Sequence, residues 1–151
     1  MKKLIVLLMF VGSVQAQEIM IEGGSHLSSG SGLAGFIRYT SDMKCPWDGR
    51  IGLAAGRWDG KYSNSVYSIN CNWVMDRKFD LLLGAALRKD NIPEDVNNDI
   101  NFELGIRLRL KEFDVGGLYG FLYHYSNGEA IGLGTDNHED NIGGIGYSVA
   151  W

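Results

Sequence analysis

Residues 100–110 read Ile-Asn-Phe-Glu-Leu-Gly-Ile-Arg-Leu-Arg-Leu, a run that alternates strictly between two kinds of side chain. Every even-numbered position is apolar, and every odd-numbered position is polar, charged or glycine. Because successive side chains of a β-strand point to opposite faces, this period of two predicts a strand with one apolar and one charged face. The alternation does not say whether the apolar face lines a soluble core or meets lipid.

The same pattern extends outward from this run along the rest of the chain. Residues 65–76 and 78–88 also alternate, with apolar side chains at odd positions. Glycine is frequent, with 21 residues against 2 prolines, which favours β structure over a disordered tail. Eight strands are predicted, at residues 19–27, 33–41, 49–58, 65–76, 78–88, 99–110, 113–126 and 141–151.

Strand length and connection length separate a membrane barrel from a soluble, lipocalin-like barrel. Most of the eight segments approach the roughly 9–11 residues that cross a bilayer at a tilt. With the amino terminus in the periplasm, short turns fall at 75–78 and 111–112 and a longer one at 41–48, while 59–64, 89–98 and 127–140 become outside loops. The sequence therefore predicts an all-β, eight-stranded antiparallel transmembrane β-barrel.

Both ends of the chain support a bacterial outer-membrane location. Lys2 and Lys3, the apolar run 4–11 and the small-residue site before Gln17 resemble a secretory signal peptide, so residues 1–16 are expected to be removed and 17–151 to form the barrel. The run is too short for a membrane-spanning helix. The last strand alternates apolar residues and ends on aromatic Trp151, which resembles the signal read by the barrel-assembly machinery.

Charge and barrel size exclude two classes of function. Without residues 1–16 the chain keeps 12 basic and 18 acidic residues, so nucleic acid is not expected as a partner. An eight-stranded barrel is filled by its own side chains and offers no channel, so transport is not expected either. The polar residues expected to form this filling are Glu22, His26, Arg38, Asn70, Asn72, Glu103, Arg107 and Arg109.

The two cysteines leave one question open. An oxidising compartment would permit a bond between Cys45 and Cys71. However, Cys45 falls in a predicted turn and Cys71 in the middle of a strand, on its lipid face, so we expect the two to remain unpaired. The spacing of these residues does not fit a zinc site, and no metal is expected.

The chemistry-bearing residues lie on strand 113–126 and after it. His124 and Ser126 are two residues apart, so a strand places an imidazole and a hydroxyl side by side on one face. An imidazole can take the proton of a serine that attacks a carbonyl, and an acidic residue, Glu139 or Asp140, can support the imidazolium. Backbone amides near Asn127 and Gly128 could stabilise the resulting oxyanion.

The direction of that face is not fixed by hydropathy, because both faces of the strand are largely apolar. Glu139 shares odd-numbered parity with Tyr147 and Trp151, which are expected to face lipid. A triad would then need His124 and Ser126 outward and the tyrosines of the strand inward, and we favour this arrangement. The structural alternative is a polar cap at the membrane rim.

The run His124-Tyr125-Ser126-Asn127, on the penultimate strand of such a barrel, resembles the lipid A 3-O-deacylases of the PagL type. The resemblance implies an esterase on the membrane-facing wall, with His124 as general base, Ser126 as nucleophile, Glu139 as acid and Asn127 beside the oxyanion. Asp140 is the alternative acid. It further implies lipid A, the lipid part of lipopolysaccharide, as substrate, and no metal or organic cofactor.

Two other classes stay open. One is a non-catalytic barrel of the OmpX type that serves adhesion or surface exclusion. The other is a lipid A acyltransferase, which would add an acyl chain. A homodimer is compatible with the sequence, which identifies no interface for it.

Overall fold

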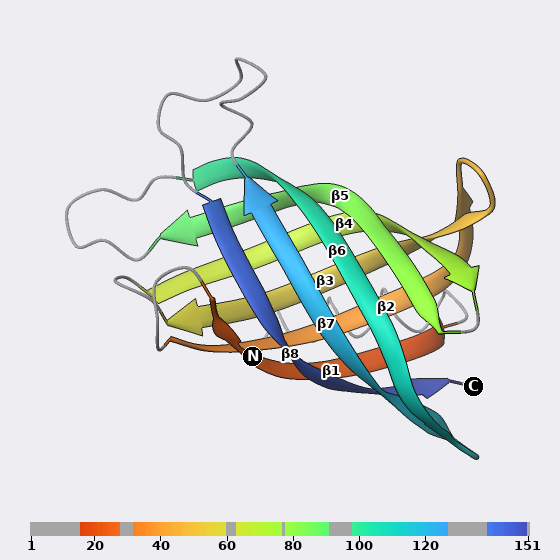
Figure 1. Cartoon of the computed structure of the whole chain (residues 1–151). Coiled ribbons are helices and arrows are strands. Elements are labelled where there is room, and N and C mark those ends of the chain that lie inside the picture. Colours follow the sequence, from red (N-terminus) through yellow and green to blue (C-terminus); the bar gives the residue numbers. More distant parts are fainter. Residues whose placement is uncertain are drawn as a thin grey trace, which may run out of the picture.

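The computed structural model describes residues 16–27, 32–59, 63–76, 78–90, 98–126 and 139–150. Within these ranges the chain forms eight strands that close into one antiparallel barrel, each strand paired with its neighbours in sequence and β1 paired with β8 (Figure 1). The strands are β1 (Ala16–His26), β2 (Leu33–Cys45), β3 (Gly49–Asp59), β4 (Ser63–Asp76), β5 (Phe79–Asp90), β6 (Asn98–Phe113), β7 (Gly116–Ser126) and β8 (Glu139–Ala150).

The predicted fold class is confirmed, and every predicted strand is present. The strands are mostly longer than expected at their ends, by up to four residues at the end of β2. The proposed signal sequence, apart from Ala16, lies outside the described residues, as does Trp151. Among the described residues, no helix is long and apolar enough to cross a membrane.

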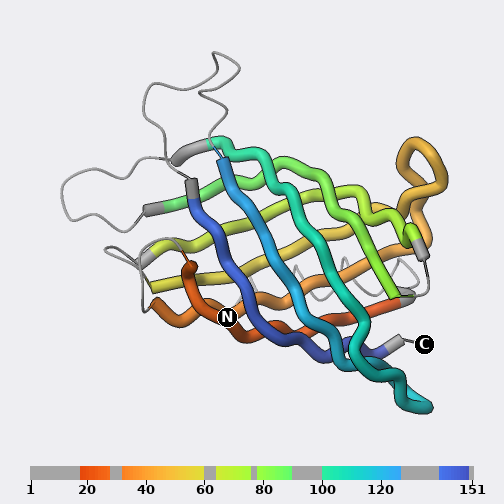
Figure 2. The backbone as a smooth tube through the Cα atoms, in the orientation of Figure 1, coloured from red at the N-terminus to blue at the C-terminus, as the bar shows by residue number. Residues whose placement is uncertain are grey.

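Short turns connect the strands at one end of the barrel. They follow β2, β4 and β6, and in Figure 2 the β2–β3 and β6–β7 hairpins extend furthest at this end. The turn predicted at Lys111-Glu112 was misplaced, because β6 continues to Phe113 after a register shift between Arg109 and Lys111. The turn residues are Asp114 and Val115. At the other end, β7 finishes and β8 begins.

The outer wall is an apolar belt, and the interior is polar. On β6 the even-numbered residues from Ile100 to Leu110 are exposed, while Asn101, Glu103 and Arg107 are buried. This is the arrangement of a membrane barrel, with the apolar face outward. The alternation of residues 100–110 therefore records which side chains meet the barrel's surroundings.

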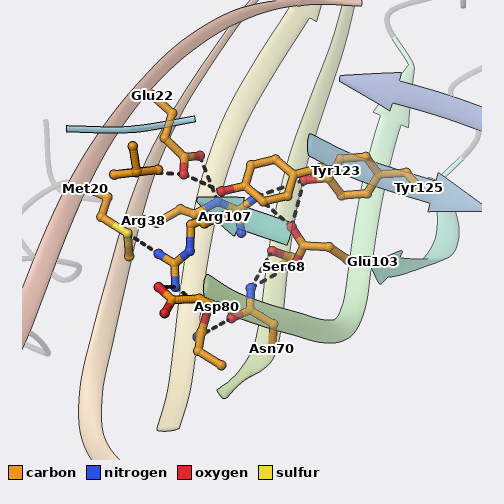
Figure 3. Close-up of polar contacts among 12 residues, drawn as sticks. Met20, Glu22, Arg38, Ser68, Asn70, Asp80, Glu103, Arg107, Tyr123 and Tyr125 are labelled. Carbon is orange, nitrogen blue, oxygen red and sulfur yellow. Dashed lines mark hydrogen bonds and ion pairs between the residues drawn. The ribbon is translucent and has the colours of Figure 1, made fainter. Parts of the chain in front are cut away.

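Buried charges are paired with one another inside the barrel (Figure 3). Arg38 donates through Nε to Glu22 at 2.9 Å and through Nη2 to Glu103 at 2.6 Å. Tyr125 and Asn70 also donate to Glu103, at 2.8 and 2.9 Å. Charges removed from water are tolerated only when paired and hydrogen bonded, and this network meets that condition.

The expected filling is confirmed for seven of its eight members, which are all buried. Arg109 is the exception: it is only partly covered and lies near the turn end, close to Asp80 and Glu112. Asp80, Arg88 and Asn101 lie on the polar faces of their predicted strands but were not named as filling, and they are buried in the interior as well.

Inward-facing aromatic rings lie over glycines on the neighbouring strand. In each case the ring and the glycine are direct partners in register, and a Cβ added to the glycine would collide with the ring. The pairs are Phe36 with Gly56, Tyr119 with Gly146 and Tyr123 with Gly105. Glycine therefore makes the space that lets an eight-stranded barrel hold these rings.

Cys45 and Cys71 form a disulfide, so the expectation that they remain unpaired was wrong. Cys45 ends β2 opposite Gly49, and Cys71 lies on β4 opposite Ile51, so the bond crosses β3. A Cβ on Gly49 would collide with the Cys45 sulfur. The missing side chain of Gly49 thus opens the path for the bridge, which the sequence separation of 26 residues did not reveal.

Candidate active site on the outer wall

The two faces of β7 differ sharply. Tyr119, Tyr123 and Tyr125 point into the barrel, and their side chains are buried. The hydroxyls of Tyr119 and Tyr123 donate to Glu22, the former at 2.9 Å. His124 lies between Tyr123 and Tyr125 along the strand, and Ser126 follows Tyr125. Both side chains are on the outer wall and are half-buried. The structure thus has the orientation that a triad on the membrane-facing wall requires.

The pair lies at the end of β7, which is at the opposite end of the barrel from the short turns (Figure 1). Ser126 is the last residue of β7, and it is the direct cross-strand partner of Glu139, the first residue of β8. His124 is the partner of Asn141. The hairpin between β7 and β8 therefore brings the sequence-predicted base, nucleophile and acid positions together, although 12 residues lie between Ser126 and Glu139.

The imidazole of His124 contacts a residue that sequence reasoning missed. Its Nδ1 lies 2.9 Å from Oδ1 of Asn141, within hydrogen-bonding distance. Asn141 is two residues after Glu139 and so lies on the same face of β8 as the expected acid. Its pairing with His124 depends on the register of β7 against β8. That register cannot be read from the sequence alone, so the contact was not predicted.

Asp140, the alternative acid, lies on the other face of β8. Its carboxylate accepts from Arg88 Nη1 at 2.9 Å and also contacts Nε2 of His26. Both partners are buried inside the barrel. The structure therefore does not bring the Asp140 carboxylate to His124, but makes it an interior anchor at the start of β8.

Part of the expected site lies outside the described structure. This is true of Asn127 and Gly128, which were assigned to the oxyanion, and of the side chain of Glu139, whose backbone alone is placed. Among the residues that are described, no group of three or more histidine, cysteine or acidic side chains could hold a metal ion.

The surroundings of the pair are apolar on the side of β6. His124 is opposite Leu104, and Ser126 is opposite Phe102, both exposed on the outer wall. Leu122, two residues before His124, is also exposed. A hydroxyl and an imidazole here border the apolar belt, where an ester attached to acyl chains could reach them.

A cavity of about 550 Å³ opens at the turn end of the barrel, remote from this pair. Its lining mixes cations and anions, including Arg50, Arg107, Arg109, Asp80 and Glu112. It contains neither His124 nor Ser126. The candidate site is therefore separate from this cavity.

No protein-family model matches the sequence, and no curated protein sequence matches it. Among solved structures, the fold is similar to the crystal structure of the outer membrane enzyme PagL. The alignment covers 89% of this chain and 99% of that chain, with a TM-score of 0.56 and 16% sequence identity. The expected resemblance to a PagL-type barrel is thus confirmed for the architecture, an eight-stranded barrel shared with an outer membrane enzyme.

Proposed function

We propose that this chain is an outer-membrane esterase that hydrolyses the 3-O-linked acyl chain of lipid A. The observation that carries the proposal is the outward placement of His124 and Ser126 at the end of β7, beside the apolar belt. A wall that faces lipid is otherwise apolar, whereas an enzyme that acts on acyl chains needs its nucleophile there. The structural likeness to an outer membrane enzyme supports this choice.

The proposed reaction uses His124 as general base and Ser126 as nucleophile. As Ser126 Oγ attacks the ester carbonyl carbon, its proton passes to Nε2 of His124. The imidazolium then gives this proton to the sugar oxygen, which leaves as an alcohol. A water molecule, deprotonated by His124, next attacks the acyl-serine and releases a 3-hydroxy fatty acid, restoring Ser126.

The remaining roles follow from position along the chain. Glu139, opposite Ser126 in register, would supply negative charge that stabilises the imidazolium. Asn127 and Gly128 follow Ser126 directly and would provide donors for the oxyanion. None of these steps needs a metal or an organic cofactor.

We also expect the barrel-assembly machinery to insert the chain through β8, and a homodimer is a compatible assembly.

The substrate class follows from the height of the site in the membrane. With the short turns in the periplasm, β7 runs outward and Ser126 lies at the outer-leaflet end. Lipid A occupies that leaflet, and its ester bonds lie where the acyl chains enter the hydrocarbon. A nucleophile that borders the apolar belt from the outer side is placed at the matching depth.

Mass spectrometry of lipid A tests the proposal in cells whose lipid A carries the 3-O-linked ester. Expression of the wild type should remove one 3-hydroxyacyl mass, and Ser126→Ala should lower the rate by about 10³-fold or more. The folded state of both proteins is checked by the gel shift between heated and unheated samples. An unchanged spectrum with folded wild type contradicts the proposal and favours an OmpX-type role, and a gained acyl mass identifies an acyltransferase.

A further inference from the structure

We propose that Asn141 is the residue that orients the catalytic imidazole, in the place that the resemblance gives to a carboxylate. This inference rests on the proposed esterase function and refines its site. Asn141 acts through His124, so it is a positioning residue. In this proposal, Glu139 acts as a nearby negative charge, and the hydrogen bond at Nδ1 of His124 is made by the neutral amide of Asn141.

The geometry of the pair supports this assignment. Nδ1 of His124 and Oδ1 of Asn141 are 2.9 Å apart, the usual length of an N–H···O hydrogen bond. The two residues are direct cross-strand partners, so the contact needs no unusual backbone. Both side chains are half-buried, which limits competition from water.

The chemistry of the amide determines which tautomer of His124 is favoured. Oδ1 of asparagine only accepts hydrogen bonds, so Nδ1 must carry the hydrogen and donate it. In the neutral imidazole, Nε2 then keeps its lone pair. That is the nitrogen that has to take the proton of Ser126. The amide thus holds the imidazole in the form that a general base requires.

The interior of the barrel keeps Asn141 in place. Its neighbour Asp140 points the other way and is held by Arg88 and His26 from β5 and β1. Its other neighbour, Ile142, is fully buried. Since Asp140 and Ile142 are both anchored inside the barrel, the backbone of Asn141 between them is held in place. The side chain of Asn141 therefore starts from a fixed position opposite His124.

A neutral partner has a consequence that a carboxylate would not have. An amide orients the imidazole but adds no negative charge, so it does not favour the imidazolium as aspartate would. Replacing Asn141 by Asp should therefore place a negative charge beside the imidazolium form of His124 and stabilise it. The acidic limb of the pH profile of kcat/KM should then move to higher pH by about one unit or more.

The first test reads the tautomer directly and does not depend on activity. His-¹⁵N-labelled protein in detergent micelles is examined at about pH 8, where an ordinary histidine is neutral, and signals of His124 are assigned by their loss in His124→Gln. The wild type should show the Nδ1–H tautomer, and Asn141→Leu should shift His124 toward Nε2–H. An Nε2–H tautomer in the wild type, or no change in Asn141→Leu, overturns the proposal.

The second test measures lipid A deacylation over pH for the same proteins. Asn141→Leu should lower kcat/KM by about 10- to 100-fold, and Asn141→Asp should keep activity near the plateau while shifting the acidic limb. Ser65→Leu is the control, because Ser65 is also half-buried and outward-facing, on β4 across the barrel. An unshifted limb in Asn141→Asp contradicts the proposal, whereas an inactive wild type with the Nδ1–H tautomer contradicts only the esterase function.

Discussion

The two faces of β7 differ in what accounts for their side chains. The tyrosines of the inner face are explained by packing in the barrel interior, whereas the polar residues of the outer face lie on an otherwise apolar wall. On the inner face, Tyr123 lies over Gly105 and under Arg38, whose guanidinium carbon is 3.9 Å from the ring centre, and its hydroxyl reaches Glu22. The ring and the hydroxyl of Tyr123 thus each contact an interior side chain. On the outer face of the same strand, His124 and Ser126, one and three residues after Tyr123, interrupt an apolar belt.

The difference teaches how to recognise function on a barrel of this size. Inside, polar residues are required, because the interior must be filled and its charges paired. Outside, polar residues near lipid lower stability and are retained only for another reason. A buried Glu or Arg in the interior is therefore weak evidence of a site, whereas one imidazole on the wall is strong evidence. Three substitutions test this contrast.

The largest effect is expected inside, for Arg38→Met. The change leaves Glu22 and Glu103 without their shared cation, and uncompensated buried charge costs about 3–5 kcal/mol. Urea unfolding from phospholipid vesicles, followed by tryptophan fluorescence, measures the loss. Arg57→Met is the control, because the Arg57 side chain is 64% exposed and its ion pair with Asp59 is long, at 3.5 Å. Loss of this ion pair should change the free energy of unfolding by less than about 0.5 kcal/mol. Equal effects would remove the distinction between the faces.

A smaller effect is expected for Gly105→Ala, which adds one methyl group under the ring of Tyr123. Crowding of this kind costs about 1–3 kcal/mol, because the ring must leave its position between the glycine and Arg38. Gly23→Ala is the matched control on β1: no atom lies within 4 Å of its added Cβ, so stability should stay within about 0.5 kcal/mol of the wild type. The same unfolding experiment compares the two variants, and a neutral Gly105→Ala would show that the ring is not confined.

The smallest effect has the opposite sign. His124→Leu should raise the free energy of unfolding by about 0.5 kcal/mol, because an apolar side chain suits the border of the belt better than an imidazole. Deacylation should be lost in the same variant. The reciprocal change Leu122→His, one outward position further from the strand end, should lower stability by about 1 kcal/mol. If His124→Leu is less stable than the wild type, His124 has a structural role and the contrast fails.

The site was predictable in part, and for reasons that differ among its residues. His124 and Ser126 were found because their spacing of two is meaningful in any strand. Asn141 was missed because its role depends on the register of β7 against β8, and no local pattern specifies a register across an intervening segment. Asp140 could be separated from the acid position only through its partners Arg88 and His26, which belong to strands distant in the sequence.

The sequence by itself determined the strands, the closed all-β class and the polar filling, because a period of two in apolar side chains is a local property. It also determined that an imidazole and a hydroxyl share one face. Tertiary structure decided which face. Tyr119 and Tyr123 turn inward where their partners on the neighbouring strands, Gly146 and Gly105, leave room for their rings. That pairing is a property of the closed barrel, and it places His124 and Ser126 on the outer wall.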